Sequence, residues 1–395
     1  MERQPEAFIM SESPNKAKLH PLLVRVGKEL QVDVYAKNGI LLLKKGHYVL
    51  SPEQRDKLLT VGLGDADEVE ARLEREKRER AAAQREAEEA ARPKNPLIEL
   101  DFLTRRIQGL LNHALAVHGF ADAIRDVADG LARLAERTPD GLIAACLLVP
   151  FSDYGSSHSL RTAALLAVLG KRLGLAPAEH KTLLCAALTM NVSVTLLHNQ
   201  LAQQGGPLTT EQREAMFAHP ILGSAILREA GVDDERWHDL VQQHHEDHDG
   251  SGYPMGLTRD EIDPLAHLLR LVDVLAALLV SNAQRPGQLP SAALARLFKG
   301  ECGAFDATYV AVLIKELGIY PPGSFVRLAS NEIAVVTQRR DKANEPKVAA
   351  LRKVDGPPYA EPLPRDTHNA MHKIVEAAPA AAAGVRPAFL VRLWK

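Results

Sequence analysis

Hydrophobic and polar positions follow a two-residue period near the N-terminus of the chain. Leu30, Val32 and Val34 alternate with polar residues, which is typical of a strand with one buried face. The pair Asn38-Gly39 follows, and this dipeptide is preferred in type I′ hairpin turns. The apolar run after the glycine therefore predicts a second strand that pairs with the first.

A helix is expected to complete this first module. Ser51 and Gln54 have the spacing of a capping box, in which side chains satisfy free backbone N–H groups at a helix start. Pro52 stands at the first helical position, where its missing N–H is not needed. The sequence thus predicts a small α+β module over residues 1–64.

Residues 65–96 have a different pattern, because almost every side chain is charged or is alanine. Alanine favours helices, and the Glu and Arg residues can pair four positions apart, so this segment is predicted to be helical. Val69 and Leu73 are its only large apolar residues, which is too few for a sustained heptad. We favour a solvated linker helix, and a weak coiled coil is the alternative.

Residues 97–320 show the 3.6-residue period of amphipathic helices. The clearest segments are residues 100–115, 180–190, 209–218, 233–244 and 264–281. Thr209 with Gln212 forms a second capping box, and Asp233 is suited to an N-cap. No strand pattern interrupts these segments, so this region is predicted to be an all-α bundle.

The two-residue period returns in residues 321–395. Two strands are predicted on either side of a turn at Ser330-Asn331, and a third within residues 347–354. The alanine-rich run at 377–384 is low in complexity, and we expect it to be loose. This region is thus predicted to be a β-rich extension with a tail.

Composition excludes several classes of protein. The 395-residue chain has 46% hydrophobic residues, enough for a large core, and its net charge of −2 argues against a general binder of nucleic acids or membrane surfaces. Its three cysteines form no CxxC pair, which fits a reducing compartment. The N-terminus lacks an apolar targeting segment, and Leu265–Val280 is too short and too polar to cross a membrane. We therefore expect a cytoplasmic protein without membrane insertion.

Three polar residues fall in phase with apolar helix faces: His158, His244 and Asp273. A single buried histidine is most often a hydrogen-bonded core residue, and that interpretation stays open for each histidine alone. A buried aspartate is harder to explain in this way, because an unpaired buried carboxylate is strongly unfavourable. Imidazole and carboxylate groups that converge inside one bundle indicate a site for a metal ion such as Fe, Mn or Zn.

The segment His244–Pro254, HHEDHDGSGYP, resembles the HHE–DG–GYP signature of the HD-GYP family, the cyclic di-GMP phosphodiesterases of bacterial signalling. Four further stretches resemble family segments in the same order along the chain. They are YGSSHSLRTA, PLTTEQREAMFAHPILGSAIL, LLRLVDVLAAL and GIYPPGS. The resemblance spans about residues 150–345 and leaves the N-terminal module and the linker helix outside it.

The resemblance implies a fold and a set of ligands. The chain is expected to be mainly α, with an HD-type all-α bundle between the small N-terminal α+β module and the short C-terminal β-rich extension. The family chemistry is hydrolysis at two metal ions, which activate a hydroxide and clamp the phosphodiester. The implied metal ligands are His158, His219, His244, His245 and Asp273.

The resemblance also implies a role for the loop and a class of partner. Gly250, Gly252, Tyr253 and Pro254 match the signature loop, where glycines let the backbone approach a large dinucleotide. For the loop alone, a plain helix end followed by a turn is the alternative. The implied ligand is cyclic di-GMP or a related cyclic dinucleotide, with no nucleic-acid partner, and the loop can also contact a diguanylate cyclase domain.

This chain departs from the family at the His-Asp pair for which the family is named. In an alignment on residues 186–188, Met190 replaces the histidine, Asn191 the bridging aspartate and Val194 a lysine. Asparagine is neutral, and a thioether is a poor ligand for Fe(II) or Mn(II), so one metal position is expected to be disabled. His198 is out of register with the missing pair and is not expected to replace it.

These departures limit the number of metal ions. His219, His244 and His245 keep one metal position, so we expect at most one divalent transition metal per chain, and a two-metal centre is doubtful.

Three interpretations of the function remain. We favour a degenerate domain that serves as a regulatory or binding module with weak or lost hydrolysis. The alternatives are an active metal-dependent cyclic di-GMP phosphodiesterase with an altered metal centre, and a phosphohydrolase with another substrate.

Overall fold

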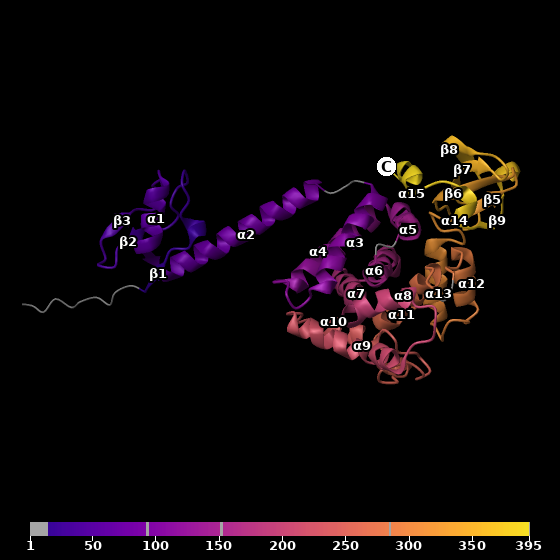
Figure 1. Ribbon diagram of the computed structural model, residues 1–395, viewed down its shortest axis with the longest axis horizontal. Coiled ribbons are helices and arrows are strands. Elements are labelled where there is room, and N and C mark those ends of the chain that lie inside the picture. Colours follow the sequence, from indigo (N-terminus) through magenta and orange to yellow (C-terminus); the bar gives the residue numbers. More distant parts are fainter. Residues whose placement is uncertain (1–14, 92–94, 151–152, 284–285, 395) are drawn as a thin grey trace, which may run out of the picture. The chain divides into compact units, whose positions relative to one another are not determined.

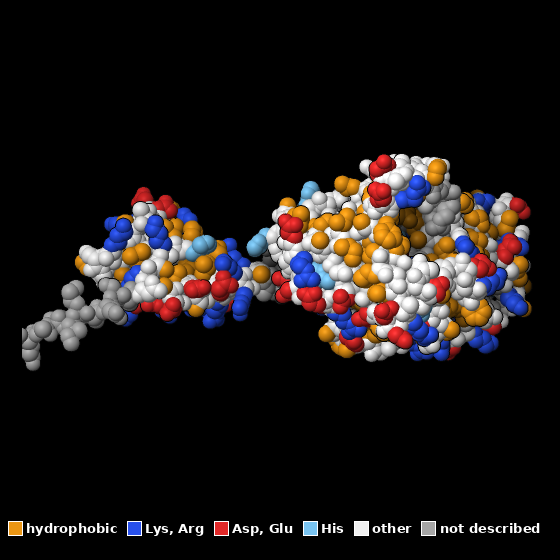
Figure 2. All heavy atoms as spheres, turned by 90° about the horizontal axis from the view of Figure 1, so that it is seen from below, with side chains coloured by type: hydrophobic (Ala, Val, Ile, Leu, Met, Phe, Trp, Pro, Cys, Tyr) orange, Lys and Arg blue, Asp and Glu red, His pale blue; other side chains and the backbone are white. Residues whose placement is uncertain are grey.

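The computed structural model describes residues 15–91, 95–150, 153–283 and 286–394 (Figure 1). The chain divides into two compact units, residues 1–92 and 93–395. Figure 2 shows acidic and basic side chains interspersed over the face in view, as expected for a net charge of −2.

The N-terminal unit contains a four-stranded antiparallel sheet in the order β1-β4-β2-β3. Its elements are β1 (Lys16–Lys18), a short 3-10 helix (Pro21–Leu23), β2 (Val34–Tyr35), β3 (Leu41–Leu43), α1 (Pro52–Val61), β4 (Leu63–Asp65) and α2 (Ala66–Ala91). The alternation of Leu30, Val32 and Val34 is confirmed, because all three are buried, although regular strand structure is confined to β2. Ser51 caps α1 by accepting from the N–H of Gln54, as predicted.

The turn between β2 and β3 differs from the prediction. A type I′ turn needs a positive φ at both central residues, but only Gly39 has one here, at 80°. The Gly39 N–H donates to the Ala36 carbonyl at 2.9 Å, and the Ala36 N–H to the Ile40 carbonyl at 2.8 Å. These bonds close a three-residue loop in which the glycine takes the left-handed position, so Asn38 need not adopt it.

The first turns of α2 belong to the N-terminal unit. Val69 is buried in the core of that unit, and Leu73 packs against it. Arg25 of the module forms an ion pair at 2.5 Å with Glu76, which lies on the predominantly charged part of α2. The two apolar residues of the predicted linker helix thus attach it to the module from which it extends.

The second unit begins with a bundle of helices, and no strand occurs among its described residues up to 320, as predicted. The helices are α3 (Pro96–Asn112), α4 (Phe120–Arg137), α5 (Pro139–Leu148), α6 (Tyr154–Leu173), α7 (Pro177–Thr189), α8 (Thr195–Gln203), α9 (Thr210–Glu229), α10 (Glu235–Gln243), α11 (Pro264–Leu279), α12 (Pro290–Phe298) and α13 (Ala307–Leu317). Residues 155–170 of α6 are all buried, and other helices of the bundle cover this helix. Polar side chains on α6 must therefore find partners inside the unit.

Helix caps agree with the sequence at one position and correct it at another. The Thr209–Gln212 capping box is present in both directions at the start of α9. At the start of α10 the cap is Asp234 rather than Asp233. Asp234 accepts from the Trp237 N–H at 3.2 Å and from the Thr182 hydroxyl at 2.9 Å, and this second bond favours it over its neighbour.

The C-terminal region forms a five-stranded antiparallel sheet in the order β8-β7-β6-β5-β9. Its strands are β5 (Phe325–Leu328), β6 (Glu332–Gln338), β7 (Lys347–Lys353), β8 (Pro358–Asp366) and β9 (Ile374–Ala378). The three predicted strands and the turn at Asn331, whose φ is 61°, are confirmed. The helical bundle, with a small sheet near each end of the chain, has the mainly α architecture that the sequence predicts.

The expectation of a loose alanine-rich tail is wrong. Residues 374–378 form strand β9 beside β5, and α14 (Ala380–Ala383) follows directly. Ala378 and Ala383 are buried in the main core. The run is low in complexity, but its small apolar side chains fit into a tightly packed core. Composition alone does not reveal such packing.

One stretch of the described residues, Pro177–Gln203, has the length and apolar composition of a membrane-crossing helix. In its most apolar 18 residues, 67% of the stretch is buried inside the unit, as in the core helix of a bundle.

Candidate metal centre

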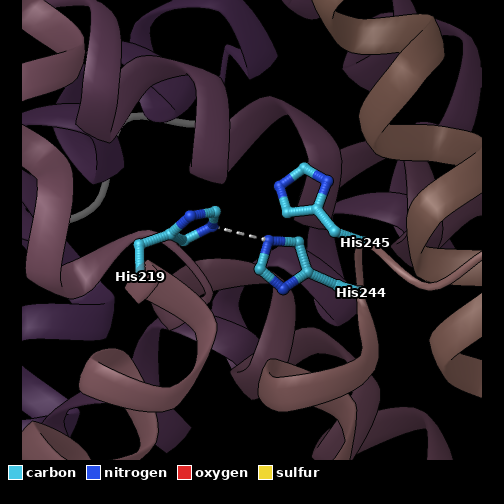
Figure 3. Close-up of side chains that lie close together, drawn as sticks. All are labelled: His219, His244 and His245. Carbon is cyan, nitrogen blue, oxygen red and sulfur yellow. Dashed lines mark hydrogen bonds between the residues drawn. The ribbon is translucent and has the colours of Figure 1, made fainter. Parts of the chain in front are cut away.

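Three histidine side chains lie together inside the second unit (Figure 3). His219 comes from α9, and His244 and His245 directly follow α10. One ligand nitrogen from each imidazole lies within 4.8 Å of the others, and the Nε2 atoms of His219 and His244 are 3.2 Å apart. We call these residues the three-histidine cluster.

The proline that follows His219 sets its orientation. Pro220 lies inside α9 and has no N–H, so the carbonyl of Met216, four residues earlier, lacks its helical donor. The Nδ1–H of His219 donates to this carbonyl instead. The bond fixes the tautomer of His219 and leaves the Nε2 lone pair directed at the cluster.

His244 is held in the same way at the end of α10. Its Nδ1–H donates at 2.7 Å to the carbonyl of Val241, one of the carbonyls that a helix end leaves free. Both Nδ1 atoms therefore carry the proton, and two unprotonated Nε2 atoms face each other across 3.2 Å. Lone pairs at this distance repel, and a cation bound by both would relieve the repulsion.

Burial keeps these imidazoles neutral. Burial, followed by the charge of His244, lowers the pKa of His219 to about 3. Burial is also the largest influence on His244 and His245, and it lowers the pKa of both. Neutral imidazole is the form that binds a metal ion, so the cluster suits a divalent transition metal at neutral pH.

The acidic residues next to the cluster have structural roles. Glu246 accepts from the backbone N–H groups of Met255 at 2.7 Å and Leu257 at 2.9 Å, and so holds the far end of the signature loop. Asp247 pairs with Arg270 on α11, with 3.0 Å between Oδ1 and Nε. Among the described residues, neither carboxylate belongs to the cluster of ligand atoms.

The signature loop folds closely over its own backbone. A Cβ on Gly252 would lie 2.3 Å from the nitrogen of Asp247, so only glycine fits there. Gly250 has a φ of 76°, in the left-handed region. This path brings the Tyr253 ring onto His245, with 4.6 Å between centroids and 15° between planes. The space at Gly252 is thus filled by protein backbone, and what the loop presents to the site is Tyr253.

The other two predicted ligands meet each other beside α6. The Nε2–H of His158 donates to Oδ1 of Asp273 at 2.6 Å, and both residues are buried. Burial is the largest influence on the pKa of Asp273 and raises it, but the hydrogen bond from His158 and the electrostatic influence of His158, His244 and His198 together outweigh burial, and the pKa is lowered. Asp273 and His158 also influence the pKa of His244, so the pair lies within electrostatic reach of the three-histidine cluster.

The positions that depart from the family motif are buried in the same region. Met190 and Asn191 are 0% and 2% exposed, and Val194 is 4% exposed. Ser193 between them donates to the carbonyl of His219 at 3.0 Å, which ties this segment to α9. Oδ1 of Asn191 is buried without a hydrogen-bond partner, an unfavourable state for an amide oxygen.

His198 lies beside the site, although its sequence position gave no reason to expect this. Its ring centroid is 6.4 Å from that of His219 and 6.3 Å from that of Tyr154. Register along one helix does not apply here, because a 3-10 turn (Val192–Val194) separates α7 from α8. The spacing within α8 could have indicated that His198 faces the interior. Thr195 is buried, and His198, three residues later, lies on the same face of the helix.

The region that contains this site is similar to known proteins. Residues 127–308 match the family model described as HD domain. A cyclic di-GMP phosphodiesterase of Pseudomonas aeruginosa is 27% identical over 218 residues, which cover 55% of this chain and 52% of that protein. A cyclic di-GMP phosphodiesterase of Borreliella burgdorferi is 25% identical over 185 residues, 47% of this chain and 48% of that protein. A solved structure of an HDG"Y"P protein from Bdellovibrio bacteriovorus has a TM-score of 0.49 at 19% identity, over 76% of this chain and 98% of that chain.

The chain spans about half the length of the curated relatives it matches. The family match begins within α4 and ends within α13, so it contains the three-histidine cluster, the His158–Asp273 pair and the signature loop. HD domains are metal-dependent phosphohydrolases, and the donor atoms of the cluster are compatible with that chemistry. The resemblance seen in the motifs is confirmed: residues 127–308 of the helical unit match the HD domain model, and the relatives that this region resembles are cyclic di-GMP phosphodiesterases.

Proposed function

We propose that the helical unit is a signalling module that binds cyclic di-GMP, or a closely related cyclic dinucleotide, at a metal ion held by the three-histidine cluster, with weak or lost hydrolysis. The facing Nε2 atoms of His219 and His244 carry this proposal, because a cation is the partner that their arrangement lacks. Phosphate oxygens of the ligand would take the open positions on that ion. The similarity to cyclic di-GMP phosphodiesterases supports the choice of ligand.

A stack of aromatic rings supports a nucleotide as the ligand. Tyr253 lies between His245 and Phe217, with centroids 4.6 Å and 5.4 Å away. Phe217 is 54% exposed, so the stack runs from a proposed metal ligand to a ring with an open face. Nucleobases stack on such faces with about 1–3 kcal/mol each. A molecule with phosphates next to bases suits both ends of the stack.

Hydrolysis is expected to be weak because the described residues around Asn191 provide no carboxylate in place of the bridging aspartate. Asn191 offers a neutral amide oxygen, and Met190 a buried thioether. In this family's chemistry two ions activate water and stabilise the departing oxygen, so an incomplete pair slows the reaction by several orders of magnitude. The retained cluster and Asp273 favour the alternative, an active phosphodiesterase with an altered centre.

Metal analysis, ligand binding and hydrolysis of the full chain, purified without oxygen, distinguish these proposals. We expect about one tightly held ion per chain, measurable binding of cyclic di-GMP by calorimetry, and hydrolysis near background. His244→Ala should abolish metal retention and weaken binding, whereas His118→Ala, which removes an exposed imidazole far along the chain, should change neither. Binding that survives His244→Ala unchanged would contradict the proposal. Robust hydrolysis that His244→Ala abolishes would favour the altered-centre enzyme.

Restoring the family pair gives a second test. The double substitution Met190→His and Asn191→Asp, with Val194→Lys as a third change, should add a tightly bound second ion. Hydrolysis should then rise by at least about tenfold, since each factor of ten in rate is about 1.4 kcal/mol of barrier. Thermal unfolding checks that these buried changes are tolerated. A folded variant with two ions and no gain in hydrolysis would show that the missing pair is not the reason for low activity.

A further inference from the structure

Two buried polar atoms beside the site form no hydrogen bond within the described residues. Nδ1 of His198 is one of them, and Oδ1 of Asn191 is the other. Proteins leave few buried polar atoms unpaired, so two of them in one region indicate a site that lacks its ligand.

The position of His198 relates it to both groups of predicted ligands. Tyr154 stacks on His158 with 7° between planes, and His198 meets Tyr154 edge-on at 6.3 Å. On its other side the His198 ring is 6.4 Å from that of His219. Imidazoles that bind the same or adjacent ions through bonds of about 2.1 Å have centroids roughly 5 to 7 Å apart, so His198 is within range of a metal position.

Electrostatics agree with this placement. Burial is the main cause of the lowered pKa of His198, which is about 4; the electrostatic influence of His158 and His244 lowers the pKa further, whereas Asp273 raises it. His198 is therefore a neutral donor at physiological pH, within electrostatic reach of Asp273, the carboxylate that accepts from His158.

We infer that His198 takes the place of the missing family histidine and, with His158 and Asp273, forms a second metal position that the family motif does not describe. Two imidazoles and one carboxylate are a donor set that suits Fe(II), with coordination sites left open. In this form Nε2 of His158 and Oδ1 of Asp273, now 2.6 Å apart, become ligands, and the Nε2 proton moves to Nδ1. This inference rests on the proposed function in one respect: the proposed function supplies the first ion, at the three-histidine cluster.

This second position should be weaker than the first. It lacks a bridging carboxylate, and the His198 side chain must turn toward the His158–Asp273 pair, because the three ligand atoms do not already form a close group among the described residues. A position of this kind binds an ion during titration but loses it during purification, which is compatible with one tightly held ion per chain.

Titration of the metal-stripped full chain with Co(II) tests the inference without any activity measurement. The probe is Co(II) itself, followed by its visible absorption and by calorimetry. Wild type is expected to bind two ions, the second at least about tenfold more weakly. His198→Ala should lose the second ion and keep the first, and the control His118→Ala should keep both. Adding Met190→His to His198→Ala should return the second ion, because it restores the family donor.

The outcomes separate this inference from the proposed function. The inference would be overturned if wild type and His198→Ala bound the second ion with equal affinity, or if wild type bound one ion only. Either result would leave the three-histidine site intact. No bound ion in wild type would overturn both. His198→Gln, which retains a polar side chain, replaces the alanine variant if circular dichroism shows that the latter does not fold.

Discussion

Among single residues, the proton position on each histidine decides what the candidate site can bind. Pro220 frees the Met216 carbonyl, and His219 uses that carbonyl to keep its proton on Nδ1. A proline inside a helix normally only weakens it, but here the lost backbone bond orients a ligand. The helix and the site therefore place opposite demands on residue 220.

Pro220→Ala should separate these two demands. The new alanine would supply an N–H to the Met216 carbonyl, so the helix gains a hydrogen bond and the melting temperature should stay equal or rise. His219 must then share the Met216 carbonyl with the alanine N–H, which weakens the bond that orients the imidazole, and metal affinity should fall about tenfold, the lower end of the range for such supporting bonds. Co(II) titration and thermal unfolding measure both effects. Pro177→Ala, at the first turn of α7 where no carbonyl is freed, is the control, and equal affinity in both variants would refute the argument.

The lowered histidine pKa values also predict how the metal-free protein responds to pH. In the unfolded chain a histidine has a pKa of about 6.5, whereas that of His219 in the folded chain is about 3. Below pH 6.5 only the unfolded chain gains this proton, so stability is fully present above that pH and falls as the pH drops. The expected slope is about 1.4 kcal/mol per pH unit for each such histidine. Urea unfolding at pH 7 and pH 5 should show a shallower loss for His219→Gln, and equal losses would speak against the prediction.

At the level of elements, α9 presents different faces to the site and to solvent. His219 is directed inward, while Phe217, Ile221 and Leu222 are 54%, 42% and 50% exposed. Exposed aromatic and aliphatic side chains next to a polar centre are suited to the flat faces of nucleobases. One helix thus provides a metal ligand and an apolar rim.

Phe217→Ala should weaken cyclic di-GMP binding by about 5-fold to 150-fold, which corresponds to the loss of about 1–3 kcal/mol of base stacking. The amount of bound metal should not change, because Phe217 is not a metal ligand and stacks on Tyr253. Calorimetry with metal analysis measures both. Phe298→Ala removes a ring that is 74% exposed on α12 and should have no effect on binding. Similar effects of the two substitutions would argue against the stack.

At the scale of the whole molecule, the C-terminal sheet is an integral part of the helical unit. Ile333, Val335 and Leu351 share the main core with the helices. Arg339, after β6, bonds Asp140 on α5 at 2.5 Å and Glu316 on α13 at 2.7 Å. The sheet therefore supports the helices that surround α6.

Arg339→Ala should lower the free energy of unfolding by about 2 kcal/mol, because it leaves two carboxylates without their cation. This is less than the about 3–5 kcal/mol of a fully buried pair, since these side chains keep some contact with water. Arg327→Ala breaks the more exposed pair with Glu376 and should change stability by less than about 1 kcal/mol. Urea unfolding compares them, and indistinguishable values would show that Arg339 does not join the sheet to the bundle.

Features that depend on neighbouring residues were predictable from the sequence. Ser51 and Thr209 cap helices as their spacing indicates, and the histidines in phase with apolar faces do point into the bundle. His198 could not be placed, because the site joins several helices and the spacing within one helix does not tell which faces meet. Asp234 and the run 377–384 were missed for a related reason, since a partner distant in the sequence, Thr182 or the core around Ala383, decides their conformation.

The facing Nε2 atoms of His219 and His244 have a consequence for the lifetime of the chain. An ion that binds only the folded state, present at about 100 times its dissociation constant, adds about 2.7 kcal/mol of stability and makes unfolding of the site roughly 100-fold rarer. Proteases cleave chains that have opened, so chains made when metal is scarce would be degraded sooner than loaded ones. The same two nitrogen atoms would then determine both what the protein binds and how long it persists.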